Sequence, residues 1–451
     1  MYKKLVNAGT ISLGSLAVSQ LIRFVSNLWL AKLLMPEAFG VVAVVNVVLM
    51  GISLFSDIGL RQVIIQKQGE LSAEFLNTLW SVQIMRGVGI FAVALLVAVT
   101  LWTLQTTGFV TTSAYAHPLL PYLIAGAALT SVFGGFSSTK LHTSYRTQAI
   151  GRVISIDLLA QIIASAVMIV VALAVRSPWA LVVGGGTAAL VKSILSHWFL
   201  VGERNALYFD RAIAVGVLRK GRWILLSSPL TFVELNGAVM LLGGLLDSAS
   251  LGVYLIASLF IGVGQLVSQN LASNVFFPGL CAAARTGAVD LRRAYLRFQL
   301  VADGLIVTLA GGLMGGGRSL IDALFDHRYA SAGGLLSSLA IGLVGLRYTV
   351  IEQLANSKGD FKLGPPTILC RIIAMLVGIL VGHQYAGLAG AAIGVGLSWF
   401  AGWPLLLWYR TKSIPSAWRS DAIAIFFLAG GYGLGLLFAE AVDRFHIRLA
   451  H

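Results

Sequence analysis

The residues that could do chemistry in this sequence are charged side chains within long apolar stretches. An Arg or Lys at the centre of a bilayer costs about 2.5–3.5 kcal/mol on insertion scales, so it must find a partner, reach the interface or line a wet cavity. A guanidinium that lines such a cavity presents a fork of N–H donors that fits phosphate oxygens. These positions therefore indicate binding of an anionic group.

Arg23 and Arg86 are the two arginines that lie deepest in these stretches. Arg23 follows Ser12, Ser15 and Ser19 at helical spacing and precedes Ser26 on the same stripe, which is the pattern of a cavity-facing helix. We predict that both arginines contact substrate. The alternatives are an Arg23 tied to carbonyls of a neighbouring helix and an Arg86 in a buried ion pair.

Three further basic residues, Lys192, Arg347 and Arg371, lie close to predicted cytoplasmic ends of helices. Long basic side chains at this depth commonly reach the lipid headgroups, and we interpret these three chiefly in that way. The functional alternative is a role in gating or in a funnel that attracts anionic lipid heads. The two interpretations are compatible.

Glu234 is the acid that we expect to matter most, because it lies near the middle of an apolar stretch. It could pair with Arg23 or Arg86, form a purely structural ion pair, or titrate as a proton or sodium site that couples transport to an ion gradient. We expect Asp57 to order a loop, and Asp303 to lie near an interface in contact with solvent.

Gln265 and Gln269 belong to a polar run that could hydrogen-bond sugar hydroxyls. The alternative is that their amides join helices to one another within the membrane. The glycine triplets at 184–186 and 315–317 have neither the preceding strand nor the following Lys of a phosphate-binding loop. We expect them, with the glycine pairs Gly312/Gly316, Gly390/Gly394 and Gly431/Gly435, to allow close helix packing or bending.

Enzyme motifs and cofactor motifs are missing from the sequence. No His pair stands at metal-ligand spacing, and the loop at 105–117 contains one His and no acid. We therefore expect no catalytic residues, no metal and no cofactor. Cys281 and Cys370 are too few for a disulfide framework or a structural zinc site.

The composition is that of an integral membrane protein. Of the 451 residues, 57% are hydrophobic and 11% are charged, and the mean hydropathy is +0.86, whereas soluble domains are about 25% charged. The net charge of +14 does not indicate nucleic-acid binding, because the basic residues lie in short loops between apolar stretches. The run after Met1 continues past Leu30 without a cleavage pattern, which predicts a retained membrane helix.

Apolar stretches of spanning length recur along the whole chain. We place thirteen spans at 8–33, 39–60, 75–102, 118–138, 153–175, 178–200, 223–246, 251–277, 298–322, 331–351, 365–383, 387–408 and 421–440. With a cytoplasmic amino terminus, 21 basic residues fall in cytoplasmic loops and 6 on the other side. This asymmetry supports both the orientation and the number of spans.

The first twelve spans divide into two halves that resemble each other. Sliding the sequence by 212 residues places Leu33 and Leu34 on Leu245 and Leu246, and Gly40-Val41 on Gly252-Val253. In both halves a long helix ends in Leu-Leu, a short turn follows, and the next helix opens with Gly-Val. Internal repeats of this kind are typical of transporters.

These motifs resemble a known family. Leu33-Leu34-Met35-Pro36-Glu37-Ala38-Phe39-Gly40-Val41, Phe55-Ser56-Asp57-Ile58-Gly59-Leu60 and Leu245-Leu246-Asp247-Ser248-Ala249-Ser250-Leu251-Gly252-Val253 are similar to the polysaccharide-transporter branch of the multidrug, oligosaccharidyl-lipid and polysaccharide exporter superfamily. The resemblance implies two six-helix lobes around a central cavity, alternating access, and polyprenyl-diphosphate-linked glycans as cargo. Members usually have twelve or fourteen spans, so an extra C-terminal helix departs from the pattern.

The expected protein is an all-α flippase of the bacterial inner membrane and not an enzyme. We expect an N-terminal lobe over 1–202, a cytoplasmic linker over 203–222, a C-terminal lobe over 223–408, and a loop, extra helix and tail over 409–451. The cargo would be an exopolysaccharide, capsule or O-antigen (lipopolysaccharide) repeat unit, whose diphosphate Arg23 and Arg86 would receive. Its partners would be membrane lipids and polysaccharide polymerase or export machinery, and no nucleic acid.

Two other functions stay open at this point. A cation-coupled multidrug antiporter of the same fold would favour an acidic or aromatic cavity, which the intramembrane arginines argue against. A membrane glycan polymerase or ligase would be expected to have a large outward loop with Arg or His, and the outward loops here are short.

Overall fold

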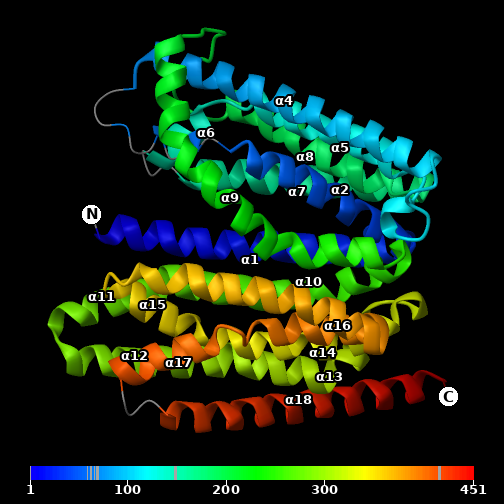
Figure 1. Ribbon diagram of the computed structural model, residues 1–451, viewed down its shortest axis with the longest axis vertical. Coiled ribbons are helices and arrows are strands. Elements are labelled where there is room, and N and C mark those ends of the chain that lie inside the picture. Colours follow the sequence, from blue (N-terminus) through cyan, green and yellow to red (C-terminus); the bar gives the residue numbers. More distant parts are fainter. Residues whose placement is uncertain are drawn as a thin grey trace. The chain divides into compact units, whose positions relative to one another are not determined.

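The computed structural model shows an all-helical chain and describes residues 2–57, 59–60, 63–64, 67, 71–146, 150–414 and 418–450 (Figure 1). No strand occurs among the residues so described. The chain divides into two compact units, Met1–Leu251 and Gly252–His451. Each unit is built from long apolar helices joined by short connections.

The first unit contains most of the long helices that we expected before residue 246. Its helices are α1 (Tyr2–Leu33), α2 (Pro36–Phe55), α4 (Ala73–Thr106), α5 (Leu120–Gly135), α6 (Lys140–Arg146), α7 (Ile150–Val175), α8 (Trp179–Trp198) and α9 (Arg211–Leu245), with the short 3₁₀ turn η1 (Ala114–Ala116). Local sequence explains several of the boundaries. Pro36 stands at the start of α2, where a missing N–H costs nothing, and Asp210 caps α9 by accepting hydrogen bonds from the N–H groups of Ala212 and Ile213.

The second unit is also all-helical, but its long helices contain irregular turns. Its elements are α10 (Ser248–Leu271), η2 (Ala272–Phe276), α11 (Phe277–Thr286), α12 (Ala288–Ala302), η3 (Asp303–Val307), α13 (Thr308–Leu324), η4 (His327–Tyr329), α14 (Ser331–Gly345), η5 (Leu346–Tyr348), α15 (Thr349–Ser357), η6 (Phe361–Leu363), α16 (Gly364–Ser398), α17 (Trp403–Ser413) and α18 (Trp418–Ala450). Both η2 and η3 are π-helical turns within otherwise continuous helices. Such turns often accompany functional or strained positions.

The helices have the length and composition of membrane spans. Nine helical stretches of the described chain meet both criteria, and two shorter apolar helices, Leu120–Gly135 and Phe232–Leu245, accompany them. Large apolar side chains such as Leu96 and Phe426 are exposed on these helices, as expected for surfaces that face lipid. The chain is therefore a multi-pass membrane protein.

The stretch Gly364–Ser413 contains two of the expected spans. Ala386 and Gly387 leave helical geometry, and Gly387 has a φ of +57°, so the chain reverses here as the sequence predicted between 383 and 387. The two arms pack tightly, because a Cβ on Gly382 or Gly390 would collide with the backbone of the other. The expected close packing at these glycines is confirmed.

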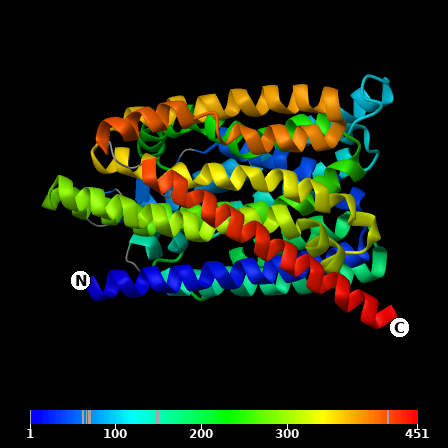
Figure 2. The same ribbon diagram turned by 90° about the horizontal axis from the view of Figure 1, so that it is seen from below.

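The expected thirteenth span is the helix α18, which lies against α13 in the second unit. Figure 2 shows α18 running obliquely across its neighbours in this unit. A Cβ on Gly431 would collide with the Thr308 carbonyl, and one on Gly435 with the Gly312 carbonyl. The extra helix is thus held by a stripe of glycines on both partners.

The helix ends support the repeat. The 212-residue offset carries Leu33, the end of α1, onto Leu245, the end of α9, and Pro36, the start of α2, onto Ser248, the start of α10. The fold is therefore two pseudo-repeated helical halves with an additional C-terminal helix.

The boundary between the compact units differs from the expected lobe boundary. We placed the helix over 223–246 in the C-terminal lobe, whereas α9 groups with the first unit. Its contacts explain this. The Phe232 ring covers Gly51, the Tyr115 hydroxyl donates to the Met240 carbonyl, and the Ala114 N–H donates to the Leu246 carbonyl. The lobe assignment by repeat remains a prediction.

Candidate functional site

A cavity of about 610 Å³ lies within the first unit, among α1, α2, α5, α7 and α8. Its apolar lining comes from Val42, Leu49, Met168, Leu181 and Val182. Its polar and charged lining residues are Ser19, Arg23, Ser26, Asn27, Asn46, Thr130, Asp157, Gln161, Ser165 and Lys192. Such a polar lining inside a bundle of apolar helices is the property expected of a binding site for a polar ligand.

Two parallel helices, α1 and α7, form one wall of the cavity. The Ser19 hydroxyl donates to Gln161 Oε1 at 2.6 Å, and Gln161 Nε2 donates back to the Ser19 carbonyl at 2.8 Å. Leu30 and Leu34 pack near Ala172 in a buried cluster farther along the same two helices. These two reciprocal hydrogen bonds fix the register of α1 against α7. They therefore also fix how far along the cavity wall Arg23 on α1 lies from Asp157 on α7.

The antiparallel helix α8 completes this wall. Gly184 packs against Met168, where a Cβ would meet the Met168 side chain at 2.9 Å. Farther from the connecting turn, Lys192 Nζ forms an ion pair with Asp157 Oδ1 at 2.6 Å. Both side chains are 41% exposed, so the pair borders the cavity and is not enclosed in the packed interior.

Arg23 is exposed at the cavity and forms no hydrogen bond or ion pair with any described residue. The amides of Asn27 and Asn46, which also line the cavity, likewise lack a described partner. Asp157 offsets the charge of Lys192, so the ionisable lining carries a net charge of +1 from Arg23. Among the described residues, the cavity therefore offers one cation without a partner, Arg23, and amide groups that also line it.

The placement of Arg23 on a cavity matches the expectation from its serine stripe, with Ser19 and Ser26 in the same lining. The side chains of Ser12 and Ser15 lie outside the described residues. Lys192 also lines the cavity, although we had interpreted it chiefly as a headgroup contact. Its ion pair with Asp157 explains why it stays there.

Arg86 does not line this cavity. Its guanidinium donates to the Ser53 carbonyl at 2.8 Å and to the Ser56 hydroxyl at 3.3 Å, and it lies 4.0 Å from Asp57. Ser53 and Ser56 are at the carboxyl end of α2, where free carbonyls attract a cation. Asp57 accepts from the Gly59 N–H at 3.0 Å, which confirms its expected role in ordering the loop. The arrangement corresponds to the ion-pair alternative for Arg86.

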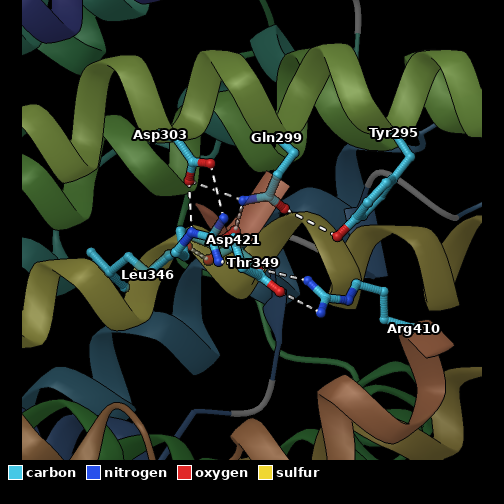
Figure 3. A network of polar contacts seen from close by, with 8 residues as sticks. Tyr295, Gln299, Asp303, Leu346, Thr349, Arg410 and Asp421 are labelled. Carbon is cyan, nitrogen blue, oxygen red and sulfur yellow. Dashed lines mark hydrogen bonds and ion pairs between the residues drawn. The ribbon is translucent and has the colours of Figure 1, made fainter. Parts of the chain in front are cut away.

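Figure 3 shows a polar network in the second unit that includes Asp303, Gln299 and Asp421. Arg347 is a buried member of this network through its ion pair with Asp303. Its Nε and Nη2 donate to Asp303 at 2.7 and 2.9 Å, and its Nη1 donates to Asp421 at 2.7 Å. Arg410 donates to both oxygens of Asp421, and Gln299 donates to Asp303. The headgroup interpretation of Arg347 is therefore wrong. The expectation that Asp303 is solvated is also wrong, because its exposure is 0%.

The remaining candidates are distributed over other helices. Arg371 on α16 donates to Glu352 at 3.1 Å and lies over the Trp399 ring. Glu234 is half-buried on α9, and the described ion pair of Arg86 is with Asp57 instead. On α10, Gln265 is half-buried and Gln269 is exposed. None of these residues lines the cavity of the first unit.

Four lining residues were not predicted from the sequence: Asp157, Gln161, Asn27 and Asn46. The sequence did contain a signal for Asp157. This acid lies inside the expected span 153–175, and the next span, 178–200, contains Lys192. Opposite charges inside two successive antiparallel spans favour an ion pair between the helices. The two asparagines had no such signal. Within the described residues no group of three or more His, Cys, Asp or Glu could hold a metal.

Comparison with known proteins gives the family. A family model described as "Polysaccharide biosynthesis protein" matches residues 29–332. No curated protein matches the sequence significantly.

Solved structures share the fold. An inward-facing multidrug resistance MATE family transporter of the MOP superfamily has a TM-score of 0.65 at 18% identity, with 88% of this chain and 94% of that chain covered. The lipid II flippase MurJ in an inward closed conformation has a TM-score of 0.64 at 14% identity, with 98% and 100% covered. A MOP superfamily transporter from Pyrococcus furiosus, described as having a binding pocket of reverse polarity, has a TM-score of 0.54 at 17% identity, with 92% and 96% covered. With the family match over most of its length, the chain belongs to the polysaccharide biosynthesis protein family.

Proposed function

We propose that this protein is a flippase that moves polyprenyl-diphosphate-linked oligosaccharides across the bacterial cytoplasmic membrane by alternating access. The observation that carries the proposal is the cavity of the first unit, in which Arg23 is a cation without a described partner among neutral hydrogen-bonding groups. A cargo with an anionic linkage and a polar glycan needs such a lining. The family match and the fold shared with a lipid II flippase support the same class of cargo.

The parts of this cargo correspond to different parts of the protein. The diphosphate binds Arg23, because a charge-assisted hydrogen bond to a guanidinium is about twice as strong as a neutral one. The sugar hydroxyls bond to the amides of Asn27 and Asn46, which have no partner among the described residues. Gln265 and Gln269 on α10 keep their predicted role as amides that bind sugar hydroxyls. The polyprenyl chain stays in the lipid, where it needs no polar partner.

The orientation follows from the charge distribution of the loops. With the amino terminus in the cytoplasm, 21 basic residues lie on the cytoplasmic side against 6 on the other. Cargo made in the cytoplasm then enters the cavity from the basic side of the protein. The carbohydrate leaves on the other side for a polymerase or an export system.

The multidrug antiporter alternative is less consistent with the cavity. Its acid, Asp157, forms an ion pair with Lys192, and the charge that has no partner among the described residues, Arg23, is positive. A cationic drug would meet repulsion at Arg23 without gaining a free carboxylate. The shared fold alone does not favour either cargo, because one fold can carry many activities.

The direct test is a flipping assay in vesicles that contain the full-length protein and a fluorescent polyprenyl-diphosphate-linked oligosaccharide. We expect Arg23→Ala to lower the flipping rate about tenfold or more, because a hydrogen bond to a charged group contributes about 1.5–3 kcal/mol. Arg293→Ala is the matched control, since Arg293 is an exposed arginine paired only loosely with Asp290 at 3.8 Å. Flipping that is unchanged in Arg23→Ala would rule out this site.

A genetic test separates the flippase from the polymerase or ligase alternative. Deletion of the gene is expected to leave lipid-linked repeat units on the cytoplasmic leaflet, where an added membrane-impermeant glycosidase cannot reach them. Accumulation on the outer leaflet would contradict the flippase and point to a defect in polymerisation or ligation.

A further inference from the structure

The cavity contains a second cation, Lys192, whose present partner faces the same space. The Lys192–Asp157 pair joins α8 to α7 at 2.6 Å, and both side chains are 41% exposed. Exposed ion pairs contribute little to stability, so a ligand can break this pair at small cost. An anionic group that enters the cavity therefore competes with Asp157 for the Lys192 ammonium.

The geometry of the helices brings Lys192 toward Arg23. The Ser19–Gln161 and Leu30–Ala172 contacts align α1 with α7 in parallel, which puts Arg23 two turns beyond Asp157, about 12 Å along the axis. Side chains lean toward the amino terminus of their own helix. Because α1 and α8 run in opposite directions, the Cα–Cβ bonds of Arg23 and Lys192 tilt toward each other along the cavity. The Lys192 ammonium is held at Asp157, and once released it can turn toward Arg23.

We propose that Lys192 is a second ligand of the cargo's diphosphate, and that Asp157 is a displaceable internal counterion that holds Lys192 until the diphosphate replaces it. Binding then exchanges an Asp157–Lys192 pair for a phosphate–Lys192 pair, and the Asp157 carboxylate turns to the water of the cavity. A monophosphate satisfies Arg23 alone, whereas a diphosphate spans both cations. The pair thus selects for two adjacent phosphates. The inference rests on the proposed function for the identity of the cargo.

The arrangement also assigns different roles to the arginines that we expected to act together. Arg86 donates hydrogen bonds to three groups of Ser53 and Ser56 at the carboxyl end of α2. It does not line the cavity. Lys192 supplies the second charge instead. Replacing Asp157 by a neutral residue is therefore expected to strengthen anion binding, a direction that general damage to the fold does not produce.

The experiment measures binding of a short-chain prenyl diphosphate and of the matching monophosphate to the full-length protein in lipid nanodiscs. We expect Asp157→Asn to bind the diphosphate about two- to fivefold more tightly than the unmodified protein, as expected from removing one exposed pair. Lys192→Gln should lose most of the preference for diphosphate over monophosphate. Asp290→Asn, at the exposed Asp290–Arg293 pair of α12, is the control and should change neither affinity.

Weaker or unchanged diphosphate binding in Asp157→Asn overturns the inference, as does a Lys192→Gln protein that keeps the full preference. No measurable binding of either probe to any variant also overturns it. The flipping assay on the same preparations separates this result from the proposed function. If the protein flips the glycan but Asp157→Asn does not change diphosphate binding, the proposed function stands and the role of the Lys192–Asp157 pair is contradicted. Tighter binding without any flipping of the lipid-linked glycan supports the anion site and contradicts the function.

Discussion

Two ion pairs of almost equal length have opposite surroundings in this protein. Lys192 and Asp157 in the first unit are 2.6 Å apart and each 41% exposed, whereas Arg347 and Asp303 in the second unit are 2.7 Å apart with side chains 3% and 0% exposed. The second pair has further partners, since Arg347 also binds Asp421 and Asp303 also accepts from Gln299. The distance between two charges therefore says little about their role, and burial and the number of further partners say much more.

The buried pair stabilises the arrangement of helices. Asp303 begins the π-turn η3, Arg347 lies in η5, and Asp421 stands near the start of α18. The network joins these elements at one end of α18, and the glycine contacts with α13 hold the helix farther along. The thirteenth helix is thus an integral part of the second unit.

The largest effect is expected from breaking this network at Arg347. Arg347→Ala leaves Asp303 as a buried carboxylate without its guanidinium, which typically costs about 3–5 kcal/mol. We expect a large drop in the thermal unfolding temperature in detergent and a reduced yield of folded protein. Arg293→Ala, which removes an exposed arginine of α12, is the control. Unfolding at the normal temperature would show that the network does not stabilise the unit.

A second effect tests the other attachment of α18. Gly435→Leu places a side chain where a Cβ already meets Gly312 and Gly316, and overpacking of this kind costs about 1–3 kcal/mol. We expect a lower unfolding temperature and weaker crosslinking between cysteines introduced into α13 and α18. Gly433→Leu is the matched control, since nothing lies within 4 Å of its Cβ position. Equal behaviour of the two variants would contradict close packing at Gly435.

Much of this architecture could be predicted from the sequence. Apolar length and loop charge placed spans on the helices that the structure contains, and the reversal at Gly387 falls in the expected gap. The glycine pairs predicted close packing because a missing Cβ lets two helix backbones approach each other. The helix ends that coincide under the 212-residue offset come from the same local pattern of Leu-Leu, turn and Gly-Val.

The partners of the charged residues could not be predicted in the same way. Depth along a helix gives the cost of a charge but not the neighbours that compensate for it. Arg347 has the depth of a residue that reaches the headgroups, yet Asp303 and Asp421 come from two other helices and enclose it. Asp421 belongs to the helix that departs from the usual span number of the family, so no family pattern pointed to it. Asp157 and Lys192 did carry such a signal, because they lie on adjacent antiparallel helices.

The smallest effect on stability is expected at the Lys192–Asp157 pair. Its measurement compares the exposed pair with the buried Arg347–Asp303 pair directly. Asp157→Asn should change the free energy of unfolding by less than about 1 kcal/mol. An exposed ion pair is only slightly more stable than the same two charges when each is hydrated separately. Thermal unfolding in detergent, measured beside Asp303→Asn, provides the check. A loss at Asp157 as large as that at Asp303 would mean that the pair fastens α7 to α8 and is not free to exchange partners. A small loss leaves the Lys192 ammonium available to an anionic ligand, which the Arg347 guanidinium, closed in by two carboxylates, is not.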